Sequence, residues 1–306
     1  MLLRHPFLAT ATVTLCAMVG CRNAAPPETA GSPATTPSPN TAAASHPDAN
    51  PARESQAPIR KPRDFKVVHV FVALCDNANQ GIVKVPAAIG NGQDPASNLY
   101  WGARYGVRTF FTQSPHWTVI QCRPRPAQVA VLERAVFRSK TAGPPVYVVA
   151  DAYDGARMHE TLTDFLGAAA GLAHEEVAIA GAGALTTLQA GGWADLVAFV
   201  GHNGLMDVRL SELPENRGGP HPEAAVVLAC KSQPYFAEPL RKAKCIPLVA
   251  TVQFMAPEAY TLDAILRGWA SGQTPEAVRQ QAAAAYATYQ KCSLTAAGRI
   301  FVSGWQ

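Results

Sequence analysis

Two stretches decide the fold: Leu196–Gly204 (LVAFVGHNG) and Ala225–Cys230 (AVVLAC). Each is an apolar run that ends in polar or reactive side chains. Neither alternates apolar with polar residues, which is typical of strands buried on both faces of a parallel sheet. Three further runs have the same character: Lys66–Leu74 (KVVHVFVAL), Val146–Ala150 (VYVVA) and Ile246–Ala250 (IPLVA). We therefore predict five buried strands.

Helical patterns separate these strands and follow the last one. The predicted helices are Ala127–Arg138, Ala156–Ala170, Pro234–Lys242, Pro257–Trp269 and Pro275–Tyr289. For the final helix, Thr274 suits the N-cap and Pro275 suits the first helical position. Strands that alternate with helices predict an α/β fold, here a three-layer α/β/α arrangement with a mostly parallel central sheet. We expect one such domain over residues 64–306.

A long insertion, residues 75–118, follows the first strand and is rich in Gly, Asn and Asp. It leaves the carboxyl end of that strand, where open α/β sheets bind their ligands. Long loops inside a compact domain are usually functional. Tyr100 and Trp101 are therefore candidates to line a substrate pocket, although the two rings would equally serve to pin the loop onto the core.

The first 20 residues are predicted to be a signal peptide, because a basic start precedes an apolar run too short to span a bilayer permanently. Residues 18–21 (MVGC) resemble the lipobox of bacterial lipoproteins, which makes Cys21 the expected lipid-bearing residue. An ordinary cleaved signal, with Cys21 incidental, is the alternative. Lipid on Cys21 would make membrane lipid a partner and hold the domain in the cell envelope. In some bacteria an Asp directly after the lipidated cysteine marks a lipoprotein for retention in the inner membrane. This chain has Arg22 at that position, which favours the outer membrane, with the domain in the periplasm or at the cell surface.

Residues 22–63 hold nine Pro, ten Ala and no aromatic residue, so they cannot bury enough surface to offset chain entropy. We interpret residues 21–63 as a lipidated N-terminus and a disordered tether. The formal net charge of +4 is modest, and several basic residues lie in the tether. The folded part therefore has no basic face that would indicate nucleic acid as a partner.

Five cysteines belong to the predicted domain: Cys75, Cys122, Cys230, Cys245 and Cys292. In an oxidising compartment five cysteines permit two disulfides and one free thiol, with the connectivity open. Outside the LVAFVGHNG stretch, the histidines of the domain show no metal-ligand spacing with Cys or carboxylates. They are His69, His116, His159, His174 and His221. We predict no metal and no cofactor.

His202 and Cys230 follow two of the predicted strands, so they are candidates for a catalytic dyad. Neighbouring parallel strands lie about 4.8 Å apart, and side chains at their carboxyl ends can meet. A thiolate is the nucleophile, and a base must take its proton. The His partner, Lys231 and the start of a helix are each expected to make Cys230 acidic. The amides of Gly204 and Cys230 are candidate oxyanion donors.

At these two strand ends the chain resembles the caspase-like cysteine peptidases, the clan of caspases, metacaspases, legumains, gingipains and separases. In that clan one apolar strand ends in His-Gly and the next ends in Ala-Cys, and LVAFVGHNG and AVVLAC follow in the same order. The resemblance implies a caspase-like fold, His202 as general base and Cys230 as nucleophile. Asn203 departs from the pattern, which places Gly directly after His.

The resemblance also puts Asp76 at the pocket that receives the substrate residue before the scissile bond. If the Asp76 carboxylate points into that pocket, the preferred substrate residue would be Lys or Arg. Asp76 would equally cap its own loop through Asn77 and Asn79. Two functions follow from the sequence. One is a lipid-anchored cysteine endopeptidase acting on a peptide or protein substrate. The other is an inactive caspase-like binding module or envelope lipoprotein that recognises a peptide or small ligand, with Cys230 idle or bridged to Cys245. Substrate and oligomeric state stay open.

Overall fold

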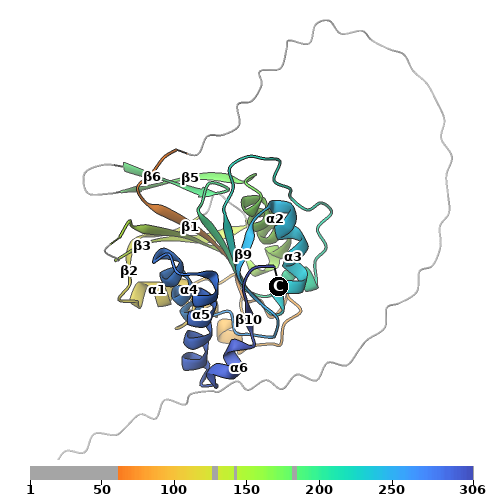
Figure 1. Cartoon of the computed structure of the whole chain (residues 1–306). Helices are drawn as coiled ribbons and strands as arrows, with labels where there is room; N and C mark the ends of the chain where they lie inside the picture. Colours follow the sequence, from red (N-terminus) through yellow and green to blue (C-terminus); the bar gives the residue numbers. More distant parts are fainter. Residues whose placement is uncertain (1–60, 126–129, 141–142, 181–184, 306) are drawn as a thin grey trace, which may run out of the picture. The chain divides into compact units, whose positions relative to one another are not determined.

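The computed structural model describes residues 61–125, 130–140, 143–180 and 185–305 (Figure 1). The predicted signal peptide, Cys21 and all but the last residues of the tether lie outside this description. Within the described ranges, no helix has the length and apolar character needed to cross a bilayer.

All five predicted strands are confirmed as parallel neighbours in one sheet. They lie in the spatial order β4–β1–β7–β8–β9. Their bounds are β1 (Lys66–Ala73), β4 (Val146–Tyr153), β7 (Leu196–Val200), β8 (Ala224–Leu228) and β9 (Ile246–Thr251). Counting only these strands, the order is 2-1-3-4-5, a common doubly wound order whose direction of winding reverses between β1 and β7. In sheets with this order, ligands commonly bind at the carboxyl ends of the strands beside that reversal.

Antiparallel strands complete the sheet at both edges and give the order β10–β9–β8–β7–β1–β4–β3–β2. The added strands are β2 (Trp117–Pro124), β3 (Val131–Ser139) and β10 (Phe301–Val302). A separate hairpin pairs β5 (His174–Ala180) with β6 (Leu185–Gly191). Short helical turns lie in the connections: η1 (Ala87–Ile89), η2 (Gly155–Arg157), η3 (Gly204–Met206) and α6 (Leu294–Gly298).

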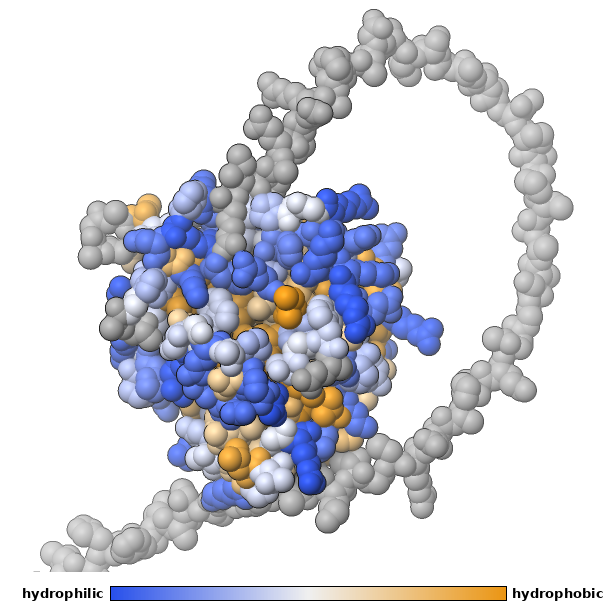
Figure 2. Space-filling model, viewed as in Figure 1, coloured by the Kyte–Doolittle hydropathy of each residue, from blue (hydrophilic) through white to orange (hydrophobic). Residues whose placement is uncertain are grey.

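Helices cover both faces of the sheet, as the strand and helix patterns predict (Figure 1). Val68, Val70 and Val72 of β1 face a core that includes residues of α1 (Val107–Gln113), α4 (Ala259–Ala270) and α5 (Pro275–Gln290). Val67, Phe71 and Ala73 face a second core with α2 (Met158–Ala169) and α3 (Ser232–Ala243). Their alternation fits the two-residue period of a strand, so β1 is apolar throughout because it contacts both cores. The face seen in Figure 2 is mainly hydrophilic, with scattered hydrophobic patches.

Four of the five predicted helices are confirmed, as α2, α3, α4 and α5. At the start of α5, the Thr274 side chain accepts the amide of Ala277 and Pro275 occupies the first turn, as expected. The predicted helix Ala127–Arg138 is wrong, because Val131–Ser139 forms β3 between β4 and β2. Its Leu, Glu, Arg and Ala favour a helix locally, but pairing with two strands outweighs that weak preference.

Arg134 ties β3 into a buried ionic network that sequence spacing did not reveal. Its guanidinium donates to Asp151 of β4 and to both carboxylate oxygens of Glu175, at 2.5 and 2.7 Å. His69 joins through Nε2, 2.9 Å from Asp151, while its Nδ1 accepts the amide of Gly191 at 3.0 Å. His69, Asp151 and Glu175 lie close enough to resemble a metal site. Arg134 already binds both carboxylates, and Arg125 pairs with Glu175 at 3.2 Å, so we interpret the cluster as structural.

Charge balance sets the protonation of this network. Burial opposes ionisation of Asp151, but hydrogen bonds from Arg134 and His69 outweigh it and hold the pKa of Asp151 well below its usual range. Burial likewise opposes ionisation of Glu175, and Arg134 again lowers the pKa on balance. Breaking a buried ion pair by removing one partner leaves an uncompensated charge.

Arg134→Met is therefore expected to lower the free energy of unfolding by about 3–5 kcal/mol at pH 7. The folded-state pKa of Asp151 lies below its unfolded value of about 4. The stabilisation from pairing Asp151 with Arg134 is therefore fully present above about pH 4 and is lost as the pH falls through the folded-state pKa. The difference from the parent chain should thus shrink below about pH 4. Urea unfolding from pH 7 to pH 3 measures it, with Arg138→Met, exposed on the same strand, as control. An equal loss at every pH would contradict the ionic explanation.

Candidate functional site

His202 and Cys230 emerge at the same edge of the sheet, from the neighbouring strands β7 and β8, of which β7 borders the reversal in winding. Val200, the last residue of β7, lies opposite Leu228, the last residue of β8. The Gly201 amide donates to the carbonyl of Leu228 at 3.1 Å and extends the pairing by one residue. Gly201 has φ +150°, and a Cβ there would lie 2.7 Å from the carbonyl oxygen of Ala73. Only glycine fits this close approach before His202.

Cys230 lies in a sharp turn that joins β8 directly to α3. Lys231, the N-cap of α3, is left-handed, with φ 48° and ψ 41°. N-cap residues normally adopt extended geometry. The other two non-glycine residues with positive φ in the described ranges, Lys244 and Lys291, lie at helix C-caps, where this conformation is common. A strained strand-to-helix turn is the geometry that exposes a nucleophile in several hydrolases.

Two buried hydroxyls hold this turn in place. The Ser232 amide donates to Oγ1 of Thr251 at 3.1 Å, and the Ser232 hydroxyl donates to the carbonyl of Val227 at 2.9 Å. The Thr251 hydroxyl donates to the carbonyl of Ala229. Both side chains are fully buried. The end of β9 thereby fixes the backbone on both sides of Cys230.

Asn203, which directly follows His202, links the two strand ends. Its side-chain amide donates to the carbonyl of Cys230 at 2.8 Å and to that of Lys231 at 3.5 Å. Asn203 is fully buried, and its Oδ1 has no hydrogen-bond partner within the described ranges. Buried polar atoms without a partner are costly and concentrate at functional sites. Nothing in the residue pattern indicates this contact beyond the position of Asn203 after His202.

The His202 ring is only 9% exposed and contacts a carboxylate. Its Nε2 lies 2.5 Å from Oδ2 of Asp207, a residue that the sequence analysis did not single out. The amide of Gly81, in the insertion, donates to the same carboxylate at 3.3 Å. The insertion therefore reaches the candidate site through its backbone, by way of Asp207.

The Cys230 sulfur is hydrogen-bonded to the backbone of Met255. The thiol donates to the Met255 carbonyl and accepts the Met255 amide, both at 3.4 Å. Burial raises the pKa of Cys230, and the Met255 amide and Lys231 lower it without offsetting burial. The expectation of an acidic Cys230 is therefore wrong for this resting state. No hydrogen bond joins Cys230 to His202 in the part of the chain that the structure describes, and such bonds are often long in enzymes without substrate.

The three residues expected to line a substrate pocket face the interior. The exposed fractions are 2% for Asp76, 8% for Tyr100 and 0% for Trp101. Asp76 accepts the amides of Ala78 and Asn79 and the side chains of Asn79 and Gln93, so it caps the loop. Trp101 donates from its indole to Glu133 at 3.1 Å. The alternative interpretation, that these residues hold the insertion on the core, is the one that fits.

The two candidate oxyanion donors lie in different surroundings. Gly204 begins η3, and a Cβ there would lie 2.3 Å from the Met158 side chain, so Gly204 packs tightly under α2. Cys230 lies in the turn before α3, and its side chain is partly exposed. Of the two residues, Cys230 is therefore the one that is partly open to solvent.

The five cysteines of the domain are free thiols. Cys245 lies in the core shared with α2 and α3, and burial raises its pKa above the range of a reactive thiol. Cys75 is fully buried, and burial raises its pKa to about 11. The bridge between Cys230 and Cys245 that would remove the nucleophile is therefore not formed.

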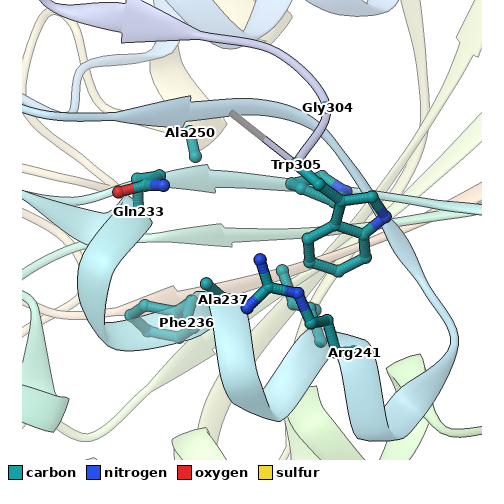
Figure 3. Close-up of a pocket in the computed structure, with 9 residues that line it drawn as sticks. Gln233, Phe236, Ala237, Arg241, Ala250, Gly304 and Trp305 are labelled. Atoms are coloured by element: carbon teal, nitrogen blue, oxygen red, sulfur yellow. The ribbon is translucent and has the colours of Figure 1, made fainter.

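A groove elsewhere in the domain is lined by α3, β9 and the residues that follow β10 (Figure 3). The Arg241 guanidinium lies 5.0 Å from the centre of the Trp305 ring. The remaining lining residues include Gln233, Phe236 and Ala250. Neither His202 nor Cys230 lines this groove, so it is separate from the candidate site.

Comparison with protein-family models, with curated proteins and with solved structures finds no match to this chain. The candidate site therefore rests on its own geometry.

The strain at Lys231 can be measured. A left-handed non-glycine residue costs about 1–2 kcal/mol, so Lys231→Gly is expected to be more stable than Lys231→Ala by about 1 kcal/mol. Both variants remove the contact between the Lys231 ammonium and the Phe254 ring, 4.5 Å apart, which cancels in the comparison. Urea unfolding gives the difference. The control is the same pair at exposed Lys140, which lacks positive φ, where Ala should be at least as stable as Gly. Equal stability of the two Lys231 variants would show that the turn is unstrained.

Proposed function

We propose that this protein is a cysteine endopeptidase with a caspase-like domain, in which Cys230 is the nucleophile and His202 is the general base. The observation that carries the proposal is the pairing of β7 with β8, which brings both residues to one edge of the sheet. The bond from Asn203 to the carbonyl of Cys230 supports it by fixing one strand end to the other. The doubly wound strand order is compatible with a caspase-like fold.

The reaction begins when His202 takes the proton of the Cys230 thiol as the sulfur bonds to the carbonyl carbon of the scissile peptide. The amide of Cys230 stabilises the oxyanion that forms. The carbon–nitrogen bond then breaks, and His202 gives the proton to the leaving amine. Water next gives a proton to His202 and its hydroxide to the thioester carbon, and the departing sulfur recovers that proton. No proton or electron is left over.

A raised pKa of the Cys230 thiol is compatible with these reaction steps. Burial keeps Cys230 as a neutral thiol at pH 7, so its proton must be removed during attack rather than beforehand. The base must therefore reach the sulfur when substrate is bound. Catalytic hydrogen bonds that are long without substrate commonly tighten in the substrate complex.

The lipobox at residues 18–21 leads us to propose further that Cys21 carries lipid and that the protein is a lipoprotein of the bacterial cell envelope. The Pro/Ala-rich stretch before Lys61 would act as a tether between the lipid and the domain. A peptidase held in this way would act on peptides or proteins near the membrane.

The second candidate function is an inactive caspase-like binding module. The observations that favour it are the hydrogen bonds of Cys230 to Met255 and of His202 to Asp207, because no hydrogen bond joins Cys230 to His202 in the described structure. In that case the domain would recognise a peptide or small ligand without cleaving it.

Peptide cleavage distinguishes the two functions. The full chain, incubated with a mixed peptide library, is expected to cut peptides, and Cys230→Ala and His202→Ala should each reduce the rate by at least about 10³-fold, because both act in the same step. New peptide termini measured by mass spectrometry report the rate. Cys292→Ala and His159→Gln, both exposed, are matched controls that should keep full activity. Activity that survives in both site variants would reject the mechanism, and inactivity of the parent chain would favour the binding module.

A further inference from the structure

Asp207 is the acidic residue that contacts His202, five positions downstream in the same loop. Its Oδ2 lies 2.5 Å from Nε2 of the ring. An ionised carboxylate only accepts hydrogen bonds, so this contact requires a hydrogen on Nε2. A neutral imidazole carries one hydrogen, which leaves the lone pair on Nδ1. The contact therefore determines which nitrogen of His202 can act as a base.

Two separate parts of the chain position Asp207, one through its backbone and one through its carboxylate. The backbone of η3 turns directly before it, where the Asp207 amide donates to the carbonyl of Gly204 at 3.0 Å. From the insertion, the Gly81 amide donates to the carboxylate at 3.3 Å. The Asp207 side chain is 43% exposed, whereas that of His202 is 9% exposed. The ring is thus buried on a carboxylate that is itself anchored, which is the arrangement needed to orient a base.

We propose that Asp207 is the positioning residue of the site, and that Nδ1 of His202 is the atom that takes and returns the Cys230 proton. This inference rests on the function proposed above. When Nδ1 takes the thiol proton, the ring becomes an imidazolium that still donates from Nε2 to Asp207. The negative charge of Asp207 stabilises that cation, and the proton leaves again from Nδ1 to the departing amine. Asp207 itself gains no proton at any step.

The tautomer of His202 provides a test that does not depend on activity. In the full chain labelled with ¹⁵N-histidine, at a pH where His202 is neutral, the ring nitrogen resonances should show hydrogen on Nε2. The signal is assigned by its absence in His202→Gln. Asp207→Asn should move hydrogen to Nδ1, because the Asn amide can donate to Nε2. Hydrogen on Nδ1 in the parent chain, or one tautomer in both proteins, would overturn the proposal.

Kinetics test the consequence for catalysis. On a peptide from the library that the parent chain cleaves, Asp207→Asn should lower kcat by about 10²–10⁴-fold with little change in KM, since it affects the base and not substrate contacts. Asp207→Glu should recover part of the loss. Glu212→Gln, an exposed carboxylate of the same connection, should behave as the parent. Unfolding curves that match the parent show that Asp207→Asn is folded, and a kcat within about twofold of the parent would then refute the positioning role.

The two experiments separate this inference from the proposed function. If the parent chain cleaves no peptide while Asp207→Asn still changes the tautomer, the peptidase proposal fails and the pairing of Asp207 with His202 stands. If peptides are cleaved through His202 and Cys230 but Asp207→Asn changes neither the tautomer nor kcat, the positioning role fails and the peptidase proposal stands.

Discussion

The structure depends on the parallel pairing of β7 with β8, in which Val200 lies opposite Leu228. Side chains alternate across a strand, so a shift of one residue would send Cys230 to the other face of the sheet. Such a shift would also move the apolar residues of β8 from one core into the other, where they would face different neighbours. The hydrophobic pattern that makes the sheet therefore also fixes where the reactive side chains emerge. Fold and candidate site are specified by the same residues.

The backbone next to that pairing is strained, and its neighbours offset the strain. Lys231 adopts a left-handed conformation, and Asn203 keeps a buried oxygen without a partner in the described structure. Against these costs stand the hydroxyls of Ser232 and Thr251, which bond to the backbone around Cys230. Strained residues persist where the surroundings determine their conformation, and they concentrate at functional sites.

Sequence alone predicted the parts of the fold that short-range pattern determines. The five buried strands have continuous apolar runs, and α5 has its cap at Thr274 and Pro275. These elements could therefore be predicted from neighbouring residues alone. β3 could not, because its residues favour a helix and become a strand only between β2 and β4. The contacts of Arg134 with Asp151 and Glu175 span 17 and 41 positions, too far for any spacing rule.

The candidate site divides in the same way. His202 and Cys230 were visible because each ends an apolar run, whereas Asp207 and Met255 contact them through loops without a periodic pattern. The insertion was expected to supply pocket side chains, yet Asp76, Tyr100 and Trp101 turn inward to hold it on the core. Its contact with the site is instead the Gly81 amide, which no side-chain pattern could indicate.

The charges around Cys230 and His202 indicate which of the two residues the proposed reaction depends on more. Burial favours the neutral form of Cys230, and Lys231 does not reverse it. A neutral thiol is a poor nucleophile, so the thiolate must be generated by a base at the moment of attack. In the proposed mechanism that base is His202, whose ring would have to present a lone pair and then carry a positive charge in a nearly buried position. A buried cation is stable only beside a negative partner. Asp207, 2.5 Å from the ring, supplies that charge.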